Sequence, residues 1–238
     1  MGNISCAPAA QDHDKDFKVR HCKGATIYAQ ADRASHWFEI ISGAVRTSRI
    51  RADGGRRVTG FFFPGDVIGV AAGRRVDMAE ALTDTLLCVH PTATLAPDGV
   101  APGLGSPLHR ALESAQASLF LLGRGSAEER LAAFLISLAI RVGQSNVLPL
   151  VMGRDDIADH LGMTPYTVSR TLRRMERSGI VACVGRHSMR ILKPGVLLEL
   201  VGEEWPTGET LIPAWYDTAG SRQPATPSPA SQMQPAMS

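Results

Sequence analysis

Cysteines and aromatic residues are scarce in this chain of 238 residues, and it has no long apolar run. The four cysteines, Cys6, Cys22, Cys88 and Cys183, are widely spaced, which excludes a disulfide framework and a Cys-x-x-Cys metal pair. The longest nearly unbroken apolar run, residues 131–140, is about half as long as a membrane span requires. The chain opens on polar residues without a signal segment, so we expect a cytoplasmic protein that does not attach to a membrane.

Charged residues are nearly balanced over the whole chain, with a net charge of +2, but they are unevenly distributed. Residues 1–140 carry 15 Lys and Arg against 14 Asp and Glu, whereas residues 141–193 carry nine against four and residues 194–238 one against five. A local basic excess of this kind is typical of a module that binds a polyanion such as nucleic acid. A basic face that only meets solvent is the alternative.

The N-terminal part of the sequence predicts a series of short β-strands separated by Gly-, Pro- and Asp-rich turn signals. The expected strands are rich in Val, Ile, Phe and Thr and cover residues 25–29, 37–41, 44–50, 58–63, 67–70 and 86–90. Short strands at such regular spacing predict an all-β barrel or sandwich.

A helix is predicted next, over residues 106–123, after a connector rich in Pro and Gly. Ser106 suits its N-cap and Pro107 its first position. Its apolar residues recur at spacings of 4, 3, 4 and 3, a narrow seam that favours a contact between two copies of the helix over a helix lying on its own barrel. The predicted dimer-interface residues are Leu108, Leu112, Ala115, Leu119 and Leu122.

Glycines at positions 123 and 125 separate this helix from another one, and the switch from strands to helices marks a domain boundary. Ser126 to Glu129 form a capping box, and Leu131, Phe134 and Leu138 lie on the apolar face of the helix that follows. After about residue 203 the composition turns rich in Pro, Ser, Ala and Gln, which predicts a disordered tail over residues 204–238.

Residues 153–192 are the most informative part of the sequence. Residues 154–161 predict a short helix, and Gly162 supplies the positive φ that a tight turn requires. Thr164 caps a second helix, which ends before Gly179. Two short helices joined by a glycine turn are the layout of a helix-turn-helix, whose second helix fits the major groove of DNA.

The second helix has two different faces. Val168, Leu172 and Met175 form a stripe at spacings of four and three, which predicts burial. The residues of the opposite, exposed face are Tyr166, Ser169, Arg170, Arg173 and Arg177. An arginine on this face can pair bidentately with a guanine edge.

A β-hairpin is predicted directly after the two helices. Residues 180–184 and 188–192 are its strands, and the turn Gly185-Arg186-His187 joins them, so the helix-turn-helix is of the winged type. The alternative is an ordinary helical hairpin with a solvated arginine face.

Residues 154–172, RDDIADHLGMTPYTVSRTL, resemble the helix-turn-helix signature of the Crp/Fnr superfamily of bacterial transcription regulators. Residues 121–135 resemble the hinge and following helix of its FixK-type and Fnr-type branches, and residues 42–45 and 62–69 resemble its cyclic-nucleotide-binding-like β-roll. The resemblance covers residues 20–195 and implies an α+β fold with a β-roll, a long dimerisation helix and a C-terminal winged helix-turn-helix. The implied parts are an N-terminal arm (residues 1–20), the β-roll domain (21–100), the dimerisation helix (106–123), the DNA-binding domain (124–196) and the tail (204–238).

The resemblance also implies a function: sequence-specific DNA binding as a homodimer on a palindromic promoter site, with activation or repression of transcription. The implied partners are double-stranded DNA and RNA polymerase. The base-reading positions of the family fall on Tyr166, Ser169 and Arg170. Its phosphate-contacting positions fall on Arg154, Thr164 and Thr167, and we expect Arg173 and Arg186 to contact phosphates as well.

Three effector chemistries occur in the family, and each requires particular residues. Cyclic AMP requires a Gly-Glu pair and an Arg-Ser pair, which read here as Gly69-Val70 and Arg75-Val76, and a valine cannot accept the hydrogen bond of a ribose hydroxyl. Arg75 is then read as a surface residue. An iron–sulfur cluster requires four thiolates, three of them close together, and the cysteine spacing does not fit.

The remaining candidates for an effector site are histidines and one cysteine. None of the seven histidines stands in a haem-ligand motif, and His160 is expected on the surface of its helix. Cys183, in the first wing strand, is read as a structural cysteine, with a low-pKa redox thiol as the alternative. We therefore expect no metal and no cofactor, as in the FixK-type branch, whose members act on genes of low-oxygen metabolism. An effector-gated regulator of the same family, controlled by a cyclic nucleotide, haem or redox chemistry, is the alternative.

An enzyme and a small-molecule-binding or scaffold protein are the rival interpretations. The sequence contains no paired-carboxylate motif, nucleophile elbow, P-loop or dinucleotide fingerprint. DNA binding that weakens steeply as salt rises would separate a regulator from a scaffold whose arginines only meet solvent.

Overall fold

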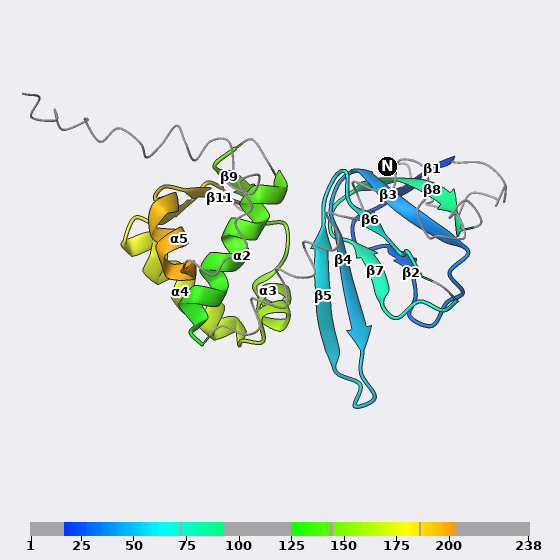
Figure 1. Ribbon diagram of the computed structural model, residues 1–238, viewed down its shortest axis with the longest axis horizontal. Helices are drawn as coiled ribbons and strands as arrows, with labels where there is room; N and C mark the ends of the chain where they lie inside the picture. The colour runs from blue at the N-terminus through cyan, green and yellow to red at the C-terminus, as the bar shows by residue number, and fades with distance from the viewer. Residues whose placement is uncertain (1–16, 72, 93–124, 143–144, 186, 203–238) are drawn as a thin grey trace, which may run out of the picture.

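The structure, a computed structural model, describes residues 17–71, 73–92, 125–142, 145–185 and 187–202. These residues form two units, one of strands and one built mainly of helices (Figure 1). The predicted tail lies outside the described residues, and so does the predicted dimerisation helix with its seam residues Leu108, Leu112, Ala115, Leu119 and Leu122.

The N-terminal unit consists of two four-stranded sheets in which every pair of neighbours is antiparallel. One sheet has the order β1 (Phe17–His21), β8 (Thr85–Pro91), β3 (His36–Ser42), β6 (Val67–Ile68). The other has the order β2 (Thr26–Tyr28), β7 (Met78–Ala81), β4 (Val45–Ile50), β5 (Arg56–Phe62). Their inner faces share one apolar core, because alternate residues of both sheets point inward and are buried together: Tyr28, Ile40, Val45, Ile68, Ala79 and Leu87.

All six predicted strands are present with shifted ends, and two strands were not predicted. The charged Lys18 and Arg20 led to the prediction that the segment of β1 is part of a polar arm. Strand β7 has the sequence Met-Ala-Glu-Ala, and Ala and Glu have low strand propensity. Pairing decides both strands: β1 runs along β8, and β7 lies between β2 and β4. The β-roll therefore begins at Phe17, inside the region predicted to be an N-terminal arm.

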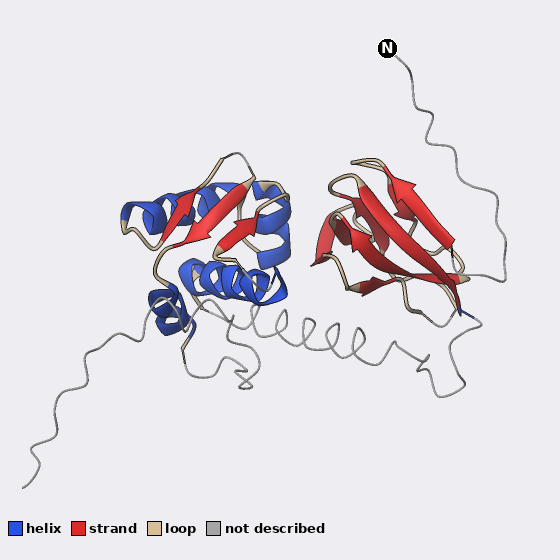
Figure 2. Cartoon of the chain, turned by 90° about the horizontal axis from the view of Figure 1, so that it is seen from above, coloured by secondary structure: helices blue, strands red, loops and turns tan. Residues whose placement is uncertain are grey.

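The C-terminal unit is a helical domain around a small sheet (Figure 2). Its helices are α2 (Ala127–Val142), α3 (Arg154–Leu161), α4 (Pro165–Arg177) and α5 (Pro194–Val201). Its sheet has the order β10 (Val181–Cys183), β11 (Ser188–Ile191), β9 (Val147–Pro149). The wing prediction is confirmed by β10 and β11, whereas β9, a strand of three residues with a proline, was not predicted.

Helix α2 belongs to the C-terminal unit and also contacts the N-terminal one. The predicted cap is present, since the Glu129 N–H donates to Ser126 Oγ at 3.1 Å. The buried face of α2 packs into the helical domain and also meets β5, where the Phe61 and Phe134 ring centroids are 6.0 Å apart. Of the helices in the described ranges, none is long and apolar enough to cross a membrane.

Candidate DNA-binding surface

Helices α3 and α4 form a helix-turn-helix with the predicted bounds. Gly162 ends α3 in the left-handed conformation (φ 62°, ψ 42°), which costs a glycine little. Thr164 is the N-cap of α4 and accepts a hydrogen bond from the Thr167 N–H at 3.1 Å, and Pro165 follows at the first helical position. The turn is thus fixed by local chemistry that is visible in the sequence.

Helix α4 buries one side and exposes the other. Val168, Leu172 and Met175 are buried as predicted, and Thr171 joins them. On the opposite side Tyr166 is 73% exposed, Arg170 and Arg173 are exposed, and Ser169 is partly exposed. A large aromatic side chain gains free energy when it is buried, so an exposed tyrosine indicates a surface that a binding partner can cover.

The residues predicted to contact phosphates lie in different settings. The hydroxyls of Thr164 and Thr167 are 2.9 Å apart at the start of α4, where backbone N–H groups favour an anion. Arg154 is the first residue of α3 and is half-buried. Arg186 lies outside the described residues.

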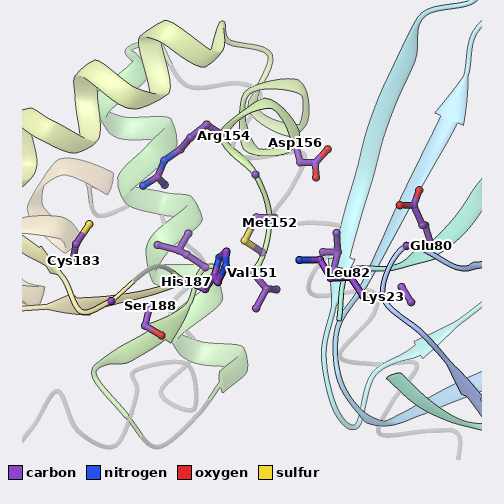
Figure 3. Close-up of a pocket in the computed structure, with 15 residues that line it drawn as sticks. Lys23, Glu80, Leu82, Val151, Met152, Arg154, Asp156, Cys183, His187 and Ser188 are labelled. Carbon is purple, nitrogen blue, oxygen red and sulfur yellow. The ribbon is translucent and has the colours of Figure 1, made fainter. Parts of the chain in front are cut away.

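A cavity of about 440 Å³ lies between the wing and the β-roll. Arg154, Cys183 and His187 line its helical side, and Lys23 and Leu82 lie across it (Figure 3). Within the described ranges, no group of three or more His, Cys, Asp or Glu side chains is arranged to hold a metal ion.

Cys183 lies at the exposed end of β10, beside Glu176 of α4. Its backbone N–H donates to Glu176 Oε1 at 3.2 Å. Hydrogen bonding to the Glu176 carboxylate raises the pKa of the Cys183 thiol above its ordinary value, and burial adds to the rise. A neighbouring carboxylate disfavours the thiolate, so these surroundings work against the low-pKa redox thiol that was the alternative prediction.

Arg75, which was expected on the surface, is 5% exposed inside the β-roll. Its Nη1 donates to the Gly69 carbonyl at 2.7 Å and its Nη2 to the His36 carbonyl at 2.6 Å. The guanidinium carbon lies 3.9 Å from the centre of the Tyr28 ring. The family resemblance matched Arg75 to an arginine that binds a cyclic phosphate, but here its Nη1 and Nη2 donate to the chain itself, and Val70 and Val76 offer no polar side chain beside it. The described residues of this region do not fit a cyclic nucleotide.

His160, expected on the surface of its helix, is only partly exposed. Its ring packs edge-on against both Phe61 of β5 and Phe134 of α2, with centroid distances of 5.2 and 6.0 Å. Burial lowers the pKa of His160 from 6.5 to about 4, so the imidazole is neutral at neutral pH. The sequence could not reveal this position, because the aromatic partner on β5 is about a hundred residues away in the chain.

A β-roll followed by a winged helix-turn-helix with an exposed recognition helix defines a DNA-binding regulatory protein. Family models match both units: the Crp-like helix-turn-helix domain matches residues 129–200 and the cyclic nucleotide-binding domain matches residues 18–96. The chain is 36% identical over 178 residues to the nitrogen fixation regulation protein FixK of Rhizobium meliloti. The matched segment covers 74% of this chain and 83% of that protein. It is 33% identical over 192 residues to the fumarate and nitrate reduction regulatory protein of Escherichia coli K12, with 76% of each covered. The solved structure of FixK2 from Bradyrhizobium japonicum matches with a TM-score of 0.69 and 29% identity, covering 79% of this chain and 98% of that one.

The chain belongs to the Crp/Fnr family of transcription regulators. Its relatives FixK and the fumarate and nitrate reduction protein are regulators rather than enzymes, and this protein is a DNA-binding regulator of the same type. The resemblance read from residues 154–172 and the α+β fold that it implied are confirmed.

Proposed function

We propose that this protein binds a palindromic promoter site as a homodimer in the cytoplasm and regulates transcription through RNA polymerase without a bound small molecule. The observation that carries the proposal is helix α4, which is capped at Thr164, buried along Val168 and Leu172, and open to solvent at Tyr166 and Arg170. A helix with this division of faces can enter the major groove without unfolding any part of its own core.

The proposed DNA contacts are divided between bases and phosphates. Tyr166, Ser169 and Arg170 read bases, because they share the exposed side of α4 near its N-terminus. The proposed phosphate contacts are Arg154, Thr164, Thr167, Arg173 and Arg186. Arg174 is not included, because it already forms an ion pair with Glu128 of α2.

Effector independence is supported by Arg75. Its guanidinium already donates to the carbonyls of Gly69 and His36, so these donors are engaged within the chain. The proposed control therefore acts on the amount of protein. An effector-gated mode through redox chemistry is less well supported, because the pKa of the Cys183 thiol is raised by Glu176.

The proposed targets are genes of low-oxygen metabolism. The support is the naming of the relatives, one a regulator of nitrogen fixation and the other of fumarate and nitrate reduction. Activation is the mode we propose, with RNA polymerase as the second partner.

Selection of bound DNA from a random pool, with the purified full chain, tests the proposal. We expect a two-fold symmetric consensus that is enriched equally in air, without oxygen, and with or without added cyclic AMP. Affinity for that site should fall log-linearly with salt, because phosphate contacts release counterions. No enriched sequence, or enrichment only with a nucleotide or only without oxygen, would overturn it.

A further inference from the structure

Helix α3, the first helix of the helix-turn-helix, is tied to the β-roll by a buried ion cluster. Nη1 of Arg46, on β4, lies 2.6 Å from both carboxylate oxygens of Asp156 on α3. Nη2 of Arg46 donates to Glu80 of β7 at 2.7 Å, and Nη2 of Arg56 on β5 donates to Asp156 at 2.7 Å. Arg46 and Asp156 are only 8% and 7% exposed, so this pair lies inside the contact between the two units.

Two more residues of α3 face the same way. Asp159 accepts a hydrogen bond from the Val58 N–H at 2.9 Å, and His160 lies against Phe61. Positions 156, 159 and 160 are three and four residues apart, so they form one face of the helix. The whole of that face meets β4 and β5.

The apolar core of the helix-turn-helix lies mainly on another side of α3. Ile157 and Leu161 carry the apolar core of α3 and are fully buried against the rest of the domain. A buried carboxylate is costly unless it is paired, and a buried ion pair often adds little net stability. The short, directional contacts of the cluster instead suit a role in setting the orientation of α3.

The orientation of α3 decides that of the recognition helix. Only the tight turn at Gly162 separates α3 from α4, and Nη1 of Arg130 on α2 donates to the Leu161 carbonyl at 3.0 Å. Helix α4 therefore follows α3 as a rigid body. A rotation of α3 against β5 would swing Tyr166 and Arg170 by the same angle.

We propose that Arg46 and Arg56, through Asp156, are positioning residues for DNA recognition that set the direction of the recognition helix relative to the β-roll. This inference rests on the proposed function, since in a homodimer the same direction sets the spacing of the two half-sites. One base pair added between half-sites turns one of them by roughly a tenth of a helical turn. A protein with fixed recognition helices discriminates against such a change, and one with loosened helices does so less.

Operators that differ only in spacer length test the role. Wild type and Asp156→Asn are compared on the selected site and on sites with one base pair added or removed. We expect Asp156→Asn to lose about tenfold of the wild-type ratio between the best and the altered spacers, because an asparagine cannot form an ion pair with either Arg46 or Arg56. Asp155→Asn is the matched control, because Asp155 is the exposed carboxylate next in the chain, and it should keep the ratio. An unchanged ratio in Asp156→Asn would overturn the proposal.

A second variant covers the case in which Asp156→Asn does not fold. The Arg56 side chain is 36% exposed, so Arg56→Gln leaves no fully buried group unpaired and should fold, as circular dichroism can verify. It should lower the same spacer ratio. If Arg56→Gln folds and both its affinity and its ratio equal those of wild type, the cluster has no positioning role.

A measurement without DNA separates this proposal from the proposed function. Spin labels at Lys18→Cys in β1 and Glu199→Cys in α5, both exposed positions, report the distance between the units in a cysteine-free background. Labelled chains diluted into unlabelled protein give only the distance within one chain. The distribution should be narrow in wild type and broad in Asp156→Asn. If wild type selects no DNA but this broadening is seen, the proposed function fails while the orienting role of the cluster stands. Equal distributions refute that role.

Discussion

The guanidinium carbon of Arg75 lies over the ring of Tyr28, 3.9 Å from its centre, and the guanidinium donates to two backbone carbonyls of its own domain. A cation held in this way satisfies partly buried acceptors and interacts with an aromatic face. The backbone accommodates it closely, since a Cβ at Gly69 would lie 2.1 Å from Arg75 Nη1.

Arg75→Ala should destabilise the β-roll. The substitution leaves the carbonyls of Gly69 and His36 without a donor and opens a void beside Tyr28, which we expect to cost about 2–4 kcal/mol of unfolding free energy. Chemical denaturation of the full chain measures it. Arg74→Ala, at the neighbouring exposed arginine, should change stability by less than about 0.5 kcal/mol. Equal stability of the two variants would contradict the internal role of Arg75.

Arg170→Ala should remove discrimination at one base pair in each half-site. Its forked guanidinium can pair with both acceptors of a guanine, so the loss should be about 1–3 kcal/mol on the selected site and much less on a site changed at that pair. Arg173→Ala should instead weaken all sequences about equally, because a phosphate contact carries no sequence information. Titration of both variants against single-base variants of the site distinguishes the two patterns, and identical patterns would refute the division of roles.

Tyr166→Glu should change the sequence that the protein selects. The family resemblance implies a glutamate at this position. A carboxylate accepts from a cytosine amino group, whereas the tyrosine hydroxyl can donate or accept and its ring can pack on a thymine methyl. Selection with this variant should shift the consensus toward the usual half-site of the family while keeping the guanine read by Arg170. A consensus identical to that of wild type would mean that Tyr166 does not read bases.

The neutral His160 should make stability depend on pH. Its pKa is about 4 in the folded protein and 6.5 when unfolded, so the unfolded chain binds the extra proton first. The contribution of His160 to the free energy of unfolding should therefore be fully present above pH 6.5 and be lost as pH drops toward 4. Denaturation at a series of pH values should show this fall in wild type and a weaker one in His160→Gln. His187→Gln, at an exposed histidine, should keep the wild-type profile.

Leu119→Glu should break the proposed homodimer. The sequence places Leu119 within the 4, 3, 4, 3 seam, where a carboxylate would be buried without a partner at a two-fold contact. Sedimentation should show monomers, and DNA affinity should fall because a monomer reads one half-site. Glu113→Gln, off the seam in the same segment, is the control. A dimer that persists in Leu119→Glu would exclude this seam as the interface.

The sequence by itself determined the helix-turn-helix. The Thr164 cap, the turn glycine and the stripe of Val168, Leu172 and Met175 act over a few residues, so their effect does not depend on the rest of the fold. The same holds for the Ser126 cap of α2 and for six strands with strong β-propensity. These local signals also carried the family resemblance.

Only the tertiary structure decided the places of Asp156, His160 and Arg75. Asp156 meets an arginine 110 positions away, and Arg75 reaches a carbonyl 39 positions away, so no local pattern marks either contact. The strands β1, β7 and β9 form for the same reason, because their partners rather than their own residues make them strands. Long-range pairing sets the burial of a side chain. Burial in turn decides whether a charged side chain is free to contact DNA or is engaged in contacts within the protein.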